Sequence, residues 1–279
     1  MKTSRRNFLA LSGAGLLASS FSGVSAFANN LSASSSKFNF ELGIASYTFR
    51  KFSLEETLKM TKDLGISKIA FKSFHLPLDA SDELIASTLE KCESAGLDLY
   101  GAGVVYMGTK EEVDNAFEYA RKAKMKMIIG VPEHEFLPYV EEKVKEYDIK
   151  LAIHNHGPGD ERYPSVESAY VLIKDMDPRM GLCLDIGHTQ RINRDPVQDL
   201  VDYYDRIHDI HVKDVTASEP DGSTCEIGRG VVDIPAFLKA VVKKNYSGVL
   251  GFEYEKNADD PLAGLAESVG YVRGVLAML

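Results

Sequence analysis

Four short apolar runs in the second half of the chain each carry a side chain of a type that binds metal ions. These side chains are His154, Asp185, His211 and Glu253, which are separated by 31, 26 and 42 residues, about one strand–helix unit each time. A parallel barrel brings the ends of successive strands onto one rim. Imidazole and carboxylate groups together can hold a divalent cation of the Mn, Zn, Mg or Co class. The pattern therefore predicts a metal centre and makes this chain a candidate metalloenzyme.

Strand alternation supports the same ligands, because residues two apart in a strand share a face. Each run places bulky apolar residues on one face and polar residues on the other. The predicted inward sets are Ala152, His154 and His156; Cys183 and Asp185; Asp209, His211 and Lys213; and Gly251, Glu253 and Glu255. A single buried His or Asp is more often an ordinary core residue. Four convergent ionisable groups, however, would be costly to bury without a cation, which favours the metal centre.

Two lysines are also predicted to point into the barrel near strand ends. Lys72 and Lys213 both have apolar neighbours in sequence, which is unusual for solvated surface lysines. A partly desolvated lysine near a metal ion can have a lowered pKa and act as an acid or a base. Both are therefore candidate catalytic residues that contact a substrate.

The elements that must position these side chains alternate from residue 41 to the end. Helix starts carry capping signals at Ser53, Ser81 and Thr109, and Gly96 fits a helix end. The predicted strands are 41–49, 67–74, 97–106, 125–131, 149–156, 180–186, 207–213 and 248–254. Later helices are predicted near 134–147, 165–176, 195–206, 233–245 and 260–278. Eight such units predict an α/β fold, a single (β/α)8 TIM barrel over 41–279, with an open doubly wound sheet as the alternative.

The N-terminus predicts an export signal rather than part of the fold. Residues 1–28 combine a twin-arginine pattern at Arg5 and Arg6, a mildly apolar stretch and a small-x-small site at residues 26–28. The apolar stretch is too short and too rich in Ser and Gly for a good membrane anchor, so no stable membrane association is expected. Residues 29–40 would form a short linker, and the expected location is the periplasm. A disordered N-terminal tail is the alternative.

Composition excludes some classes of partner. The chain carries a net charge of −9, and loss of Lys2, Arg5 and Arg6 with the signal would make it −12. Such an acidic protein repels nucleic acid and anionic membrane surfaces. The three cysteines, Cys92, Cys183 and Cys225, are odd in number and widely spaced, so they do not predict a disulfide framework.

Residues 41–279 resemble the xylose isomerase-like TIM-barrel superfamily, which includes sugar isomerases and epimerases, inosose dehydratases and an AP endonuclease branch. The resemblance rests on four motifs: Leu184-Asp185-Ile-Gly-His188, His211-Val-Lys213-Asp214, Glu226-Ile-Gly228-Arg-Gly230-Val-Val-Asp233 and Gly248-Val-Leu-Gly-Phe-Glu253. It implies one divalent metal ion held by Asp185, His211, Glu253 and the side chain at position 154. It also implies that His188 lies beside the metal and contacts the substrate. Homodimers are common among such barrels, but no interface can be identified from the sequence.

Position 154 departs from the superfamily's common pattern. Isomerases and epimerases place a Glu there, whereas His154-Asn-His156-Gly resembles the His-x-His stretch of inosose dehydratases. Of the usual carboxylate pair only Glu253 remains as a catalytic residue. An imidazole bound to metal through one nitrogen cannot easily transfer protons. This assigns proton transfer to His156, His188, Lys72 or Lys213.

The resemblance implies proton abstraction next to a carbonyl group in a small carbohydrate. We expect elimination or hydration, catalysed by a lyase or dehydratase, on an unphosphorylated keto-sugar or keto-glycoside. A sugar isomerase or epimerase is the close alternative. A non-catalytic carbohydrate-binding barrel is a more distant one. A nuclease is disfavoured by the acidic charge, the export signal and the small number of metal-ligating groups.

Overall fold

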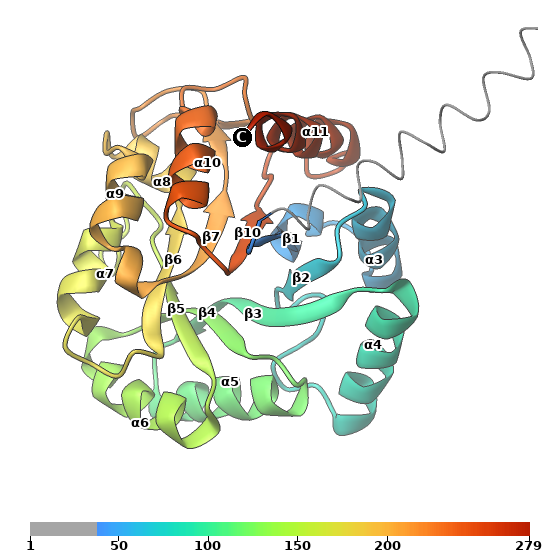
Figure 1. Cartoon of the computed structure of the whole chain (residues 1–279). Coiled ribbons are helices and arrows are strands. Elements are labelled where there is room, and N and C mark those ends of the chain that lie inside the picture. Colours follow the sequence, from blue (N-terminus) through green and yellow to red (C-terminus); the bar gives the residue numbers. More distant parts are fainter. Residues whose placement is uncertain (1–37) are drawn as a thin grey trace, which may run out of the picture. The chain divides into compact units, whose positions relative to one another are not determined.

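The computed structural model describes residues 38–279, which form a closed barrel of eight parallel strands (Figure 1). The predicted export signal over residues 1–28 and residues 29–37 of the predicted linker lie outside the described residues. The barrel strands are β1 (Glu41–Ala45), β2 (Lys68–Phe71), β3 (Asp98–Met107), β4 (Met127–Pro132), β5 (Lys150–His154), β6 (Met180–Asp185), β7 (Ile207–Val212) and β10 (Val249–Phe252).

The strands follow one another around the barrel in chain order, and pairing of β1 with β10 closes it. The helices surround the strands on the outside, as Figure 1 shows. They are α3 (Leu54–Asp63), α4 (Asp82–Ala95), α5 (Lys110–Lys122), α6 (Leu137–Tyr147), α7 (Val166–Ile173), α8 (Ile186–Arg191), α9 (Pro196–Asp202), α10 (Ile234–Lys243) and α11 (Leu262–Met278). Short 3-10 helices are η2 (Ser46–Phe49), η3 (His134–Phe136) and η4 (Tyr204–Arg206). The predicted single (β/α)8 barrel is confirmed.

The capping signals in the sequence mark real helix ends. Ser53 and Glu56 form a complete capping box at the start of α3, and Gly96 ends α4 in the left-handed conformation. At α5, the Thr109 side chain accepts a hydrogen bond from the backbone N–H of Glu112. The Glu112 carboxylate accepts from Gly108 instead of from Thr109. Local hydrogen bonding therefore fixes these boundaries.

Several strand ends differ from the prediction, mostly on the rim where strands meet loops. The predicted strand 41–49 stops at Ala45, because the Thr48 side chain takes over backbone hydrogen bonding with Phe252 and Tyr254 as the chain coils into η2. The strand predicted over 67–74 ends at Phe71, so Lys72 lies just beyond it. Helix α8 and a small hairpin, β8 (Asp214–Val215) with β9 (Thr224–Cys225), were not predicted.

Alternation along the strands is as predicted. The apolar residues between the polar ones, such as Leu184, Ile210 and Phe252, are buried in the main hydrophobic core. A second, smaller apolar cluster contains Tyr100, Ala152 and Cys183. All three cysteines are buried and free. No helix within residues 38–279 has the length and apolarity needed to cross a bilayer.

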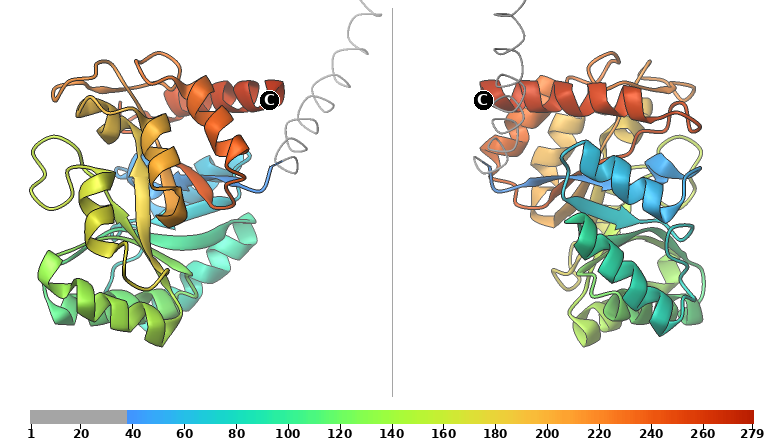
Figure 2. Two further views of the ribbon diagram at one scale, coloured as in Figure 1. Left: turned by 60° about the vertical axis from the view of Figure 1, so that its left-hand side comes forward. Right: turned by 90° about the vertical axis from the view of Figure 1, so that its right-hand side faces the viewer.

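Two long connections, β5–α7 and β7–α10, project on the same side of the molecule (Figure 2, left). The second is tied down by Asp214, whose carboxylate accepts hydrogen bonds from four backbone N–H groups, those of Val215, Gly228, Gly230 and Val232. Any side chain at Gly230 would begin 2.1 Å from an Asp214 oxygen. The Gly228-Arg-Gly230 turn thus serves the fold, because its amides bind Asp214.

Replacing Asp214 with Ala should destabilise the protein by about 3–5 kcal/mol, because four backbone donors lose a charged acceptor together. Asp214→Asn, which keeps one acceptor oxygen, should lose less. Urea unfolding followed by circular dichroism measures both changes. Equal stability of Asp214→Ala and the wild type would show that water replaces the carboxylate. The Asp214 clamp, meaning Asp214 with the four backbone N–H groups that donate to it, would then contribute nothing to stability.

Candidate metal centre

The barrel register brings the four predicted ligands together. Asp185 lies opposite His211 in the pairing of β6 with β7, after a register shift between Leu182 and Cys183. His154 ends β5, and Glu253 directly follows β10. All four side chains are buried at the C-terminal ends of their strands, the end at which barrels of this kind hold their active sites.

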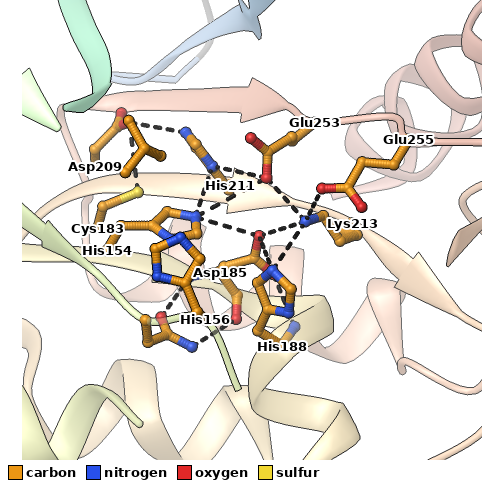
Figure 3. Close-up of polar contacts among 12 residues, drawn as sticks. His154, His156, Cys183, Asp185, His188, Asp209, His211, Lys213, Glu253 and Glu255 are labelled. Atoms are coloured by element: carbon orange, nitrogen blue, oxygen red, sulfur yellow. Dashed lines mark hydrogen bonds and ion pairs between the residues drawn. The ribbon is translucent and has the colours of Figure 1, made fainter. Parts of the chain in front are cut away.

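Four donor atoms face one another at this point: His154 Nε2, Asp185 Oδ2, His211 Nδ1 and Glu253 Oε2 (Figure 3). His154 Nε2 lies 3.1 Å from His211 Nδ1 and 3.5 Å from Asp185 Oδ2. His211 Nδ1 lies 3.3 Å from Glu253 Oε2. All ligand atoms of the set fall within 4.8 Å of one another.

The donor set fits a divalent metal ion. A tetrahedral ion with bonds of about 2.1 Å would hold its donors about 3.4 Å apart, close to the spacings found here. Asp185 Oδ2 is buried and accepts no hydrogen bond, and its counter-charge is the Lys213 ammonium at 3.0 Å. Two imidazole nitrogens and two carboxylate oxygens suit ions of the zinc or manganese class. His154, Asp185, His211 and Glu253 are thus the residues that would hold the ion.

The electrostatics of the set keep both carboxylates ionised. Burial alone would raise the pKa of Asp185, but the Lys213 ammonium outweighs it and holds that pKa well below its ordinary value. Glu253 behaves in the same way through Lys213 and His211. Burial lowers the pKa of His154 to about 4, so this imidazole is neutral and its lone pair is available to a metal.

Lys213 is the cation of this cluster. Its Nζ lies 3.0 Å from Asp185 Oδ2 and donates to Glu253 at 2.8 Å and to Glu255 at 2.9 Å (Figure 3). The side chain is 1% exposed. Burial would lower its pKa, but the three carboxylates raise that pKa well above the ordinary value. Lys213, predicted to contact the substrate, therefore contacts two of the metal-ligand oxygens and lies beneath the pocket surface.

Glycine at position 187 makes room for this lysine. A Cβ at Gly187 would lie 2.7 Å from Lys213 Cγ. Asp185, two residues earlier, caps α8 by accepting from the N–H of His188, and Asn155 accepts from the N–H of Asp185. The Asp-Ile-Gly-His motif thus places a carboxylate of the donor set, the space for the lysine stem and a pocket-lining histidine within four residues.

A pocket of about 250 Å³ opens above the donor set. His154 and Glu253 line it, as do the predicted catalytic residues Lys72, His156 and His188. His156 lies beyond the end of β5, and its Nε2 is 3.2 Å from the Tyr106 hydroxyl. Burial lowers the pKa of His156 and that of Lys72. Both are half-buried groups whose uncharged forms are favoured by their surroundings.

His188 lies between Lys213 and Arg191. Its Nε2 is 3.3 Å from Lys213 Nζ, and its Nδ1 is 3.4 Å from an Arg191 nitrogen. Burial, reinforced by Lys213, lowers its pKa to about 3. His188 is therefore a neutral hydrogen-bonding group and a weak proton acceptor.

Two further pocket residues, Tyr47 and Tyr106, were not singled out from the sequence, and a third, Glu255, was predicted only to face inward. Glu255, 31% exposed, binds Lys213 and lines the pocket with Tyr47 and Tyr106. Glu255 shares the alternation of Glu253 and faces inward as predicted, although no role had been assigned to it. The two tyrosines follow or end strands whose other residues carry no chemical signal, and only the closed barrel brings them here.

Replacing His154 with Gln should abolish stoichiometric binding of a divalent metal, because one of two nitrogen donors is lost from the set. The matched control is His208→Gln, since His208 is on the same barrel but outside the donor set. Elemental analysis after loading with Zn²⁺ and gel filtration measures the metal content. Retention of one ion per chain by His154→Gln would remove this residue from the centre.

Lys213→Met should cost about 3–5 kcal/mol in the presence of a chelator, because a buried cation is removed from a cluster of carboxylates. Added Mn²⁺ should reduce this loss by neutralising the same oxygens. Urea unfolding with chelator and with Mn²⁺ measures the two values, with the exposed Lys59→Met as control. An equal loss under both conditions would contradict a shared set of oxygens.

Comparison with known proteins places this barrel in a family. Residues 135–275 match the model of the xylose isomerase-like TIM barrel. Among solved structures, a putative uncharacterized protein from Parabacteroides distasonis is 29% identical, covering 85% of this chain and 99% of that chain, with a TM-score of 0.68. Among curated proteins, none matches this chain.

Two more distant structures share the fold. The IOLI protein, solved with a zinc atom, is 16% identical over 86% of this chain and 99% of its own, with a TM-score of 0.71. The 3-keto-D-glucoside 4-epimerase YcjR from E. coli is 15% identical over 84% of this chain and 99% of its own, with a TM-score of 0.65. The family match spans half of this chain and includes Asp185, His211 and Glu253. The chain belongs to the xylose isomerase-like TIM-barrel family.

Proposed function

We propose that this protein is a divalent-metal-dependent enzyme that removes a proton next to a carbonyl group in an unphosphorylated keto-sugar or keto-glycoside. The favoured outcome is elimination, or hydration in reverse, as in a lyase or dehydratase. The observation that carries the proposal is the composition of one small pocket. Metal-ligand groups form its floor, and Lys72, His156 and His188 line the same 250 Å³ space.

When bound, the metal ion would supply Lewis acidity to a carbonyl oxygen and a neighbouring hydroxyl. The side chains around the pocket must then supply the group that accepts the proton. Lys72 and His156 suit this role, because burial lowers the pKa of both groups and so favours the uncharged forms that can accept a proton. His188, with a pKa of about 3, suits hydrogen bonding to a substrate hydroxyl.

Elimination requires an acid as well as a base. The C–H bond beside the carbonyl breaks, its electrons form a C=C bond, and the oxygen on the next carbon leaves with a proton. Lys72 Nζ lies 5.1 Å from the centre of the Tyr106 ring, and the Tyr106 hydroxyl is hydrogen-bonded to His156. One member of this connected group can accept the first proton while another supplies the second.

Histidine at position 154 favours elimination over epimerisation. Epimerases need a base on each face of the reacting carbon, and the superfamily resemblance implies a carboxylate pair for that purpose. Here the neutral His154 replaces one carboxylate, and Lys213 holds Glu253 in its ionised form. The proton-transfer groups come instead from Lys72 and His156, on the ends of β2 and β5.

The size of the pocket and the predicted export of the protein support the substrate class. A 250 Å³ pocket suits one sugar ring, while the exposed Tyr106 at its edge leaves room for a substituent. The predicted export signal favours unphosphorylated carbohydrate from outside the cytoplasm. The structural neighbour named as a 3-keto-D-glucoside 4-epimerase supports keto-glycosides as the first compounds to test.

Proton NMR in D₂O with Mn²⁺-loaded and then chelator-treated protein tests the reaction. With ketoses and 3-keto-glucosides, deuterium should enter the carbon beside the carbonyl only in the presence of metal. Release of the glycosidic alcohol indicates elimination, whereas an inverted product indicates an epimerase. Metal-loaded protein that exchanges no proton in any compound would favour the non-catalytic carbohydrate-binding barrel.

Side-chain variants assign the proton acceptor. Lys72→Gln or His156→Gln should slow deuterium incorporation by about 10²–10⁴-fold if the residue transfers the proton. Lys51→Gln and His134→Gln are matched controls, because both residues are exposed and outside the pocket. Normal exchange in both pocket variants would exclude these two residues and move the role to Glu255 or His188.

A further inference from the structure

The barrel interior below the metal centre holds a buried carboxylate to which the proposed reaction gives no role. Asp209 precedes His211 by two residues on β7 and is fully buried (Figure 3). Its Oδ2 lies 3.4 Å from the Tyr100 hydroxyl, 3.8 Å from Cys183 Sγ and 3.7 Å from His211 Nε2. Its other oxygen, Oδ1, has no hydrogen-bond partner.

This arrangement is expensive for a structural residue. A buried carboxylate normally has several strong donors or a full positive charge beside it. Asp209 has one long hydrogen bond from a hydroxyl and one from a thiol, and in the part of the chain that the structure describes the one ionisable cation beside it is the His211 imidazole at 3.7 Å. The neighbouring residues Tyr100, Ala152 and Cys183 belong to an apolar cluster, which offers a carboxylate little solvation. Packing alone therefore does not account for an aspartate.

The two nitrogens of His211 have different surroundings. Nδ1 faces His154 and Glu253 in the donor set. A neutral imidazole that binds metal through Nδ1 must carry its hydrogen on Nε2. Nε2 is buried and unpaired, and within residues 38–279 the acceptor in reach is Asp209 at 3.7 Å. A shift of a few tenths of an ångström would convert this contact into a hydrogen bond.

We propose that Asp209 is a positioning residue of the metal centre, which receives the Nε2–H of His211 and thereby presents the Nδ1 lone pair to the ion. Metal-ligating histidines commonly donate their second N–H to a carboxylate, which fixes the ring and raises its basicity. Asp209 is placed to accept this hydrogen bond from His211, two residues further along the same strand. The second nitrogen of His154, Nδ1, has no hydrogen-bond partner among the described residues. The proposal concerns metal binding and does not depend on the reaction.

Zn²⁺ affinity in the purified protein tests the proposal, measured by competition with a chelating dye. Asp209→Leu should weaken binding by about 10–100-fold. Asp209→Asn, which keeps an acceptor oxygen without the charge, should lose less. Tyr100→Phe is the matched control, because it removes the hydroxyl that donates to Asp209 and leaves the contact between Asp209 and His211 in place. Unchanged affinity in Asp209→Leu would overturn the proposal.

Stability without metal separates positioning from a structural role. Replacing a buried charge with a well-packed apolar residue is often neutral or stabilising, so chelated Asp209→Leu should unfold at the same urea concentration as the wild type or higher. Weaker Zn²⁺ binding with undiminished stability supports the proposal. Parallel loss of stability and affinity in both Asp209 variants would assign Asp209 to the fold instead. ¹⁵N NMR of the Zn²⁺ form should find the hydrogen of His211 on Nε2, and its location on Nδ1 would also overturn the proposal.

Discussion

Concentrated negative charge in a nearly dry space is the constraint on which this structure depends. Asp185, Glu253 and Glu255 converge on a single amine, that of Lys213. Asp185 and Glu253 also belong to the metal-ligand set, so the amine and a bound metal ion would interact with the same oxygens. Because isolated buried carboxylates are very unfavourable, the cluster needs at least one of these cations to persist. Lys213 therefore influences both the stability of the barrel and its affinity for metal.

The barrel meets this constraint by dividing the work among strands and the loops that follow them. β5, β6, β7 and β10 supply the donor atoms, and a register shift in β6 aligns Asp185 with His211. Gly187 leaves space for the lysine stem, and Asn155 holds the backbone of Asp185 from the neighbouring strand. The first half of the barrel contributes Lys72 and Tyr106 to the pocket. The donor set thus comes from the second half of the barrel, whereas both halves line the pocket above it.

The sequence was sufficient for the barrel and the donor set because both depend on local periodicity. Two-residue alternation identified the inward faces, and the spacing of His154, Asp185 and His211 followed the strand–helix repeat. Lys213 was correctly placed inside, but its contacts depend on Gly187 and on three distant carboxylates. The position of Tyr106 in the pocket and the formation of η2 could not be predicted, since both depend on how the strand ends and loops meet at the rim. Strand ends were least predictable there, where side chains such as Thr48 replace backbone pairing.

The Asp214 clamp has a consequence for how this family member can change over evolutionary time. Asp214 directly follows Lys213, and its carboxylate fixes the amides of residues 228–232. An insertion within residues 228–232 would displace these amides and with them Asp214, the chain neighbour of Lys213. At the tip of the same connection residues 219–221 are exposed, and side-chain hydrogen bonds from Gln190 and Arg191 reach Ser218 and Pro220. Sequence changes can therefore accumulate at the tip, while the base of the loop stays fixed in length.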